Sequence, residues 1–172
     1  ICYRGIEVSA RLQYALLGIE VIILVAFSVI ALTKVYTGNA TPDSLTPSLD
    51  WLWPSGLSLS ALVTATLIAV FIYWGWDTAV SVNEETKDPD KTPGRAAIIS
   101  TLLLLLTYAS VSVASVAFAG TSEEGLGLAN PENSDDVFGA LGPTVFGDSM
   151  MGRGMEILLI LSVLSSAAAS TQ

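Results

Sequence analysis

Long apolar stretches alternate with polar segments along the chain, and four of these stretches have the length of a membrane-spanning helix. A helix needs about 20 consecutive apolar residues to cross the hydrocarbon core of a bilayer. The pattern predicts helices over residues 12–33, 57–86, 96–119 and 155–172. A surface helix of a soluble protein carries a polar face, and the leucine run at 102–106 has none. We therefore predict an all-α membrane protein in which residues 1–172 form a single partial transmembrane domain.

The segments between these helices are rich in Pro, Gly and charged residues, which is typical of loops. They cover residues 34–56, 87–95 and 120–154. Most of the Lys and Arg residues fall on one side of the predicted helices: Arg4, Arg11, Lys87, Lys91 and Arg95. Cytoplasmic loops of membrane proteins carry the excess of Lys and Arg. We therefore expect Arg4 and the 87–95 loop in the cytoplasm, the loops 34–56 and 120–154 outside, and the protein in the plasma (cytoplasmic) membrane.

Composition narrows the classes of function. The chain is 52% hydrophobic and only 13% charged, against about 25% charged in an average soluble domain. A net charge of −9 argues against a nucleic-acid partner, because binding phosphates requires clustered Lys and Arg. With no His and one Cys, the usual zinc ligand sets and the Ser-His-Asp and Cys-His catalytic groups are missing. We expect no metal, no cofactor and no enzymatic activity.

The most informative segment lies in the second predicted span and reads Phe71-Ile72-Tyr73-Trp74-Gly75-Trp76-Asp77. Gly75 lacks the Cβ atom that keeps a backbone helical, and non-helical backbone inside a membrane is tolerated where it lines a cavity. The segment predicts a break near residues 73–76 that frees the carbonyls of Phe71 to Trp74 to bind a cation. Two simpler interpretations stay open. Gly75 can be a packing glycine, and Asp77 can lie close enough to the inner surface to reach water.

Two further features of the predicted spans can carry function. Glu20 lies about two turns inside the first span, where the low dielectric disfavours a charged carboxyl, so it can bind and release a proton. The alternative is that Glu20 pairs with a basic residue of another helix. Ser165 and Ser166 lie among alanines in the last span, where small residues favour close helix packing. A cation site made from hydroxyl and carbonyl oxygens is the second interpretation of this stretch.

The stretch from Asp77 to Arg95 resembles the amino acid–polyamine–organocation permeases. An aromatic-Gly-aromatic-acid segment ends at Asp77, a Glu-Glu-x-Lys-x-Pro turn and a basic-Thr-Pro tail follow, and a new span begins after Arg95. In that family this stretch joins the sixth and seventh transmembrane helices, and Gly5 to Gln13 is similar to the start of the fifth. The resemblance covers essentially the whole chain. It implies a partial LeuT-type five-plus-five inverted-repeat transporter fold, represented here by helices 5 to 8, one of them broken.

The resemblance also implies a function, namely secondary active transport of an amino acid by alternating access, coupled to a proton or to sodium. The substrate ammonium group would bind the carbonyls of the broken helix. Alternatives are a polyamine or small-amine transporter, and a non-transporting receptor or scaffold with the same fold. The implied substrate-binding residues are Phe71, Ile72, Tyr73, Trp74, Gly75 and Trp76. The implied gating or coupling residues are Asp77, Glu20, Ser165 and Ser166. Some relatives have a lysine at about the position where this chain has Glu20, so the chain departs from that arrangement.

Overall fold

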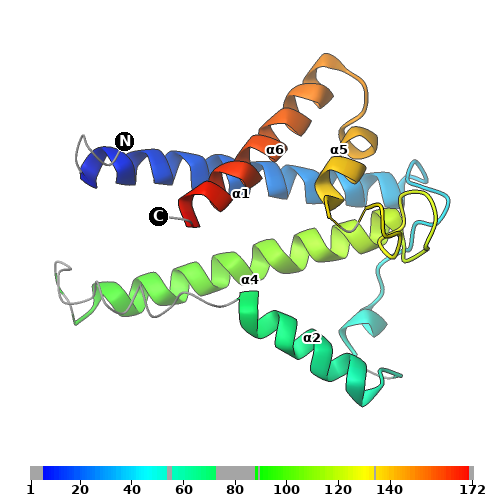
Figure 1. The fold of residues 1–172 in the computed structure, drawn as a ribbon, viewed down its shortest axis with the longest axis horizontal. Helices are drawn as coiled ribbons and strands as arrows, with labels where there is room; N and C mark the ends of the chain where they lie inside the picture. Colours follow the sequence, from blue (N-terminus) through cyan, green and yellow to red (C-terminus); the bar gives the residue numbers. More distant parts are fainter. Residues whose placement is uncertain (1–5, 54–55, 73–87, 89, 134, 171–172) are drawn as a thin grey trace. The chain divides into compact units, whose positions relative to one another are not determined.

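The computed structural model describes residues 6–53, 56–72, 88, 90–133 and 135–170, and gives only the backbone for 6–12, 71–72 and 162–170. Within these residues all regular secondary structure is helical (Figure 1). The elements are α1 (Ile6–Tyr36), the short 3-10 helix η2 (Leu49–Leu52), α2 (Leu59–Ile72), α4 (Thr92–Ala119), α5 (Val137–Phe146) and α6 (Met150–Ser170). The prediction of an all-α membrane protein is confirmed.

Two of these helices are long and apolar enough to cross a membrane by length and composition, namely Gln13–Tyr36 within α1 and Thr92–Ala119. They lie at the positions of the first and third predicted spans. Only the first part of the second predicted span is described, as α2, because residues 73–86 lie outside the described residues. The last helix, α6, begins at Met150, five residues before the predicted start at 155.

The chain divides into two compact units, and the prediction that residues 1–172 form one partial transmembrane domain stays a prediction. One unit comprises Ile1–Pro47 with Leu106–Gln172, and the other comprises Ser48–Leu105. The division falls inside α4. The first unit therefore holds α1, α5, α6 and the second half of α4, and the other unit holds η2, α2 and the first half of α4.

The hydrophobic core of the first unit forms along one face of α1. Ile23, Phe27 and Ala31 of α1 are buried, and their spacing of four residues places them on the same side of the helix. On the other sides of this stretch of α1, Ile22, Val25 and Val29 are exposed, which suits contact with lipid. The core contains Ile23, Phe27, Ala31, Ala114, Phe118, Ala119, Leu141, Val145 and Leu159. It thus joins α1, α4, α5 and α6.

Phe27 lies at the centre of the contacts between α1 and α5. Its ring is fully buried and meets two rings of α5 edge to face. The ring centroids are 5.4 Å apart for Phe138 and 6.0 Å apart for Phe146. Edge-to-face aromatic pairs are attractive beyond the area that they bury. α6 packs against both α1 and α5, and Figure 1 shows α6 crossing α1.

The helix α5 corrects the expectation that residues 120–154 form a loop. Gly139, Gly142 and Pro143 all disfavour a helix, and each has a position inside α5. Two contributions offset them. The carboxylate of Asp136 accepts a hydrogen bond of 2.8 Å from the backbone N–H of Gly139 and caps the helix N-terminus. The buried side chains of Leu141 and Val145 supply the tertiary packing.

We expect Phe27→Ala to destabilise the protein far more than Val29→Ala. In buried cores of soluble proteins, Phe→Ala costs about 3–5 kcal/mol because contacts are lost and a cavity remains. The side chain of Val29 is 58% exposed, so its truncation creates no cavity. Thermal unfolding of the full-length protein in detergent micelles measures both variants. Equal falls in Tm would contradict the central position of Phe27.

Candidate functional site

The segment that carries the predicted substrate site lies at the end of α2. Phe71 and Ile72 are the last two residues of this helix, and only their backbone is described. Residues 73–77, with the predicted break near 73–76 and the acid Asp77, lie outside the described residues. The predicted contribution of this segment to substrate binding therefore stays a prediction.

The other predicted residues belong to the first unit. Ser165 and Ser166 lie in α6, and their side chains are outside the described residues. Glu20 is fully described and lies in α1. α1 and α6 pack against each other, so the structure brings together the helices that carry these three residues.

Glu20 lies on the protein-facing side of α1. Its side chain is half-buried, as are those of Leu16 and Leu24, which lie one turn before and after it. On the same side follow the buried Ile23 and Phe27. The neighbouring positions on the other sides are exposed and apolar: Leu17, Ile19 and Ile22. We call the row Leu16, Glu20, Ile23, Leu24, Phe27 and Ala31 the protein-facing stripe of α1.

This placement is what a functional or paired carboxyl requires. An ionisable side chain inside a membrane is costly where it faces lipid, and such residues face the bundle interior or a water-filled cavity. The stripe puts Glu20 on the interior side and gives the lipid-facing positions to aliphatic side chains. The described residues hold no group of three His, Cys, Asp or Glu side chains able to bind a metal ion. A carboxyl in this position can bind a proton, or a single cation together with other oxygen atoms.

Thr41 and Leu45, which follow α1 in the chain, donate hydrogen bonds to backbone carbonyls at the C-terminal end of α4. The last four carbonyls of a helix have no partner within the helix. The backbone N–H of Leu45 donates to the carbonyl of Ala117 at 2.8 Å, and the hydroxyl of Thr41 donates to the carbonyl of Phe118 at 2.5 Å. Gly120, with φ +72°, lies so close to the backbone of Asp43 that a side chain at Gly120 would collide with it. These contacts fix the connection between α1 and α4 at this end of the first unit.

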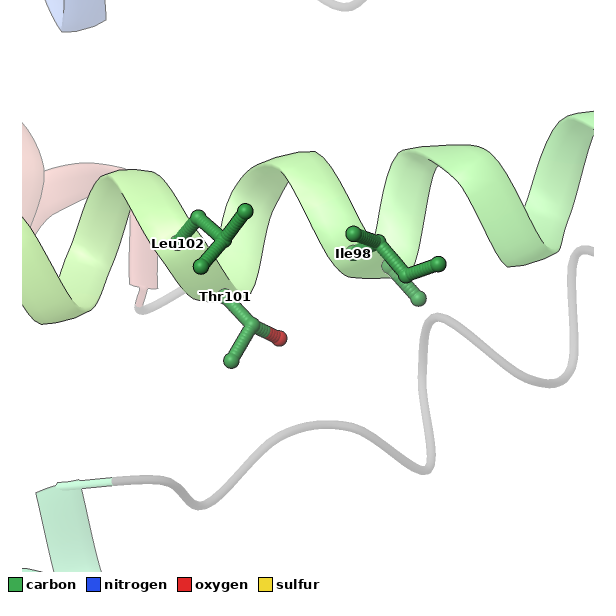
Figure 2. Close-up of a pocket in the computed structure, with 4 residues that line it drawn as sticks. Ile98, Thr101 and Leu102 are labelled. Carbon is green, nitrogen blue, oxygen red and sulfur yellow. The ribbon is translucent and has the colours of Figure 1, made fainter.

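A shallow pocket in the other unit has a different character. It is lined by Ala97, Ile98, Thr101 and Leu102, all from α4 (Figure 2). Their spacing places them on one side of the helix, and three of the four side chains are apolar. Such a surface suits lipid tails or another helix. It offers a substrate one hydroxyl and no charged group, so we do not assign it to substrate binding.

Comparison with known proteins decides the family. The family model described as "Amino acid permease" matches residues 1–171. The chain belongs to the amino acid permease family. This permease chain is 28% identical over 165 residues to uncharacterised transporters of Mycobacterium bovis and Mycobacterium tuberculosis. The match covers 94% of the chain and 35% of each relative, so the chain spans about a third of their length. No solved structure matches it.

The family match confirms the resemblance drawn from Asp77 to Arg95. The sequence analysis nevertheless missed two polar residues that hold α5 in the first unit, Asp136 and Lys34. Asp136 caps α5, and the ammonium group of Lys34 donates a hydrogen bond of 2.7 Å to the carbonyl of Thr144 in α5. Asp136 is followed by apolar residues at 137, 138, 141 and 145. That spacing, read as an N-cap before an amphipathic helix, is the signal that could have found α5.

We expect a cysteine at position 20 to react with a water-soluble thiol reagent, and a cysteine at position 17 to resist it. The thiolate that reacts forms only in contact with water. Leu17 is 49% exposed on the lipid-facing side of α1, whereas Glu20 lies on the interior side. The measurement is the labelling rate of Glu20→Cys and Leu17→Cys in an otherwise cysteine-free full-length permease in membranes. Faster labelling at position 17 would contradict the assignment of the two sides.

Proposed function

We propose that the permease is a secondary active transporter of an amino acid that works by alternating access. The observation that carries this proposal is the match to the amino acid permease family along residues 1–171. The relatives' description as transporters supports it. Transport of this kind needs no covalent chemistry, because the substrate and a coupled ion bias the exchange between outward-open and inward-open states. A polyamine or another small amine is the second substrate class, because Asp77 would favour a cation.

The substrate site of this proposal is the end of α2 and the residues after it. The carbonyls of Phe71, Ile72, Tyr73 and Trp74 receive the substrate ammonium group, and the break in the helix lies at Gly75. Either Trp74 or Trp76 closes the site as a gate. The support is the unusual run of residues and the general use of broken helices as ligand sites in transporters.

Glu20 is the proposed coupling residue, with a proton as the coupled ion. Its position in the protein-facing stripe of α1 supports this role, because proton exchange needs a carboxyl that is shielded from lipid and can be reached by water. Sodium is the alternative ion, and it would bind near Ser165 and Ser166 of α6. Coupling to a proton requires the carboxyl of Glu20, whereas coupling to sodium near Ser165 and Ser166 does not. Replacing Glu20 therefore distinguishes the two ions.

The proposed orientation follows from the distribution of Lys and Arg. We propose that the protein lies in the plasma membrane, with Arg4 and the 87–95 loop on its cytoplasmic side. α5 and the segment after α1 then lie on the outer side. The apolar and exposed positions of α1 and α4 face the lipid bilayer.

We expect labelled amino acids to accumulate in proteoliposomes of the full-length permease when a proton gradient is imposed. Glu20→Gln removes the titrating group and keeps the side-chain size, so the uptake should lose its dependence on pH. The measurement compares an imposed proton gradient with an imposed sodium gradient for both proteins.

Each outcome has a distinct meaning. Unchanged pH dependence in Glu20→Gln would overturn the coupling role of Glu20. Uptake driven by sodium alone would retain the transporter and move the coupling site to Ser165 and Ser166. Binding of amino acids or amines without any uptake or exchange would favour the receptor or scaffold alternative.

We expect Gly75→Val to abolish uptake while insertion into the membrane is retained. A β-branched side chain restricts the backbone to fewer conformations, and the proposed break needs the freedom of glycine. Gly18→Val is the matched control, since a Cβ at Gly18 of α1 meets no atom within 4 Å. The measurement is uptake normalised to the amount of protein in the membrane. Full uptake by Gly75→Val would show that the break is elsewhere.

A further inference from the structure

The C-terminal ends of α1 and α5 meet at one ammonium group. Lys34 belongs to the last turn of α1, and its Nζ atom donates a hydrogen bond of 2.7 Å to the carbonyl of Thr144 in the last turn of α5. The carbonyls at a helix C-terminus lack partners within the helix and form its negative pole. A single positive charge therefore stabilises the ends of two helices at the same time.

The end of α5 is also tightly joined to α6. The connection consists of Gly147, Asp148 and Ser149, and Gly147 has a φ of +78°. The Gly147 N–H donates to the carbonyl of Pro143 at 2.9 Å, which closes the last turn of α5. Ser149 accepts a hydrogen bond of 3.0 Å from the N–H of Gly152 and so caps the first turn of α6.

Gly152 makes this connection rigid. It is buried, and a Cβ atom there would collide with the carbonyls of Phe146 and Gly147. The first turn of α6 thus lies directly against the last turn of α5. We call residues 143–153 the α5–α6 corner. Short length, two capped helix ends and close backbone contact leave this corner few ways to change shape, so α5 and α6 are expected to move together.

Two kinds of contact join the corner region to α1. The ring of Phe27, two turns before Lys34 in α1, packs edge to face against Phe138 and Phe146. The hydrogen bond from Lys34 has a defined length and direction. The side chain of Lys34 is half-buried, and its bond to the exposed Thr144 lies at the surface of the unit. The lysine therefore fixes the register between the end of α1 and the corner.

We propose that Lys34 is a positioning residue that fastens the C-terminal end of α1 to the α5–α6 corner and sets the separation of α1 and α6 at this end. This role goes beyond the proposed transport function and does not depend on the substrate or the coupled ion. Alternating access rearranges helices relative to one another. Lys34 determines whether α1 and the corner move as one body in that rearrangement.

The test measures the distance between α1 and α6 directly. Spin labels replace Tyr36 of α1 and Met151 of α6, both exposed, in the full-length permease in lipid nanodiscs. Pulsed electron–electron double resonance spectroscopy then gives the distribution of distances between the two spin labels. We expect a narrow distribution in the parent protein and a broader one, shifted to longer distances, in Lys34→Met. Lys34→Arg should restore the narrow distribution because a guanidinium group also donates to a carbonyl.

Lys91→Met is the matched control, because Lys91 is an exposed lysine of the other unit and its loss changes the net charge by the same amount. It should leave the distribution unchanged. If Lys34→Met does not yield folded protein, Lys34→Gln retains a polar side chain with a shorter reach and should shift the distribution in the same direction. A parent-like distribution in Lys34→Met or Lys34→Gln overturns the proposal, as does an equal change in Lys91→Met. The distances are read without substrate, so this test can fail or succeed independently of uptake.

Discussion

The packing of Phe27 against α5 is the interaction on which the first unit depends. In a bilayer no water is expelled when helices associate, so van der Waals contact between closely fitting side chains holds them together. A fully buried ring between two other rings supplies many such contacts at once. α5 needs them, because a ten-residue helix with two glycines and a proline is too short and too weak to form alone. α6 in turn starts from the corner that α5 provides.

The same stripe of α1 that forms the core also carries Glu20. Seven residues, or about two helical turns, separate Glu20 from Phe27, so both project to the same side of the helix. Close packing around Phe27 fixes the rotation of α1 about its own axis. That rotation turns Glu20 toward the protein and leaves Leu17, Ile19 and Ile22 exposed, which suits contact with lipid. The packing of Phe27 thus determines the environment of the Glu20 carboxyl two turns away in the same helix.

The existence of α1 and α4 could be predicted from their apolar length, but the orientation of α1 could not. A helix in a bilayer has apolar side chains on both its lipid-facing and its protein-facing sides, so the 3.6-residue period that reveals a buried face in a soluble helix disappears. The helix α5 was missed for another reason. Gly139, Gly142 and Pro143 are loop signals, and tertiary packing of Leu141 and Val145 outweighs them. The early start of α6 was hidden in the same way, because Gly152 serves close contact between backbones rather than a turn.

Contacts to backbone carbonyls explain why the rest of the site could not be predicted from residue types. The carbonyl of Thr144 binds the ammonium group of Lys34, yet any residue at position 144 would offer the same atom. The proposed substrate site uses the same chemistry, since the carbonyls of Phe71 to Trp74 would bind the substrate ammonium group whatever their side chains are. The sequence marks the end of α5 with Gly147, and the proposed break would give Gly75 the same role in the segment after α2. In the proposed transport function, as at Thr144, a helix end rather than a particular polar side chain would then be the element that binds positive charge.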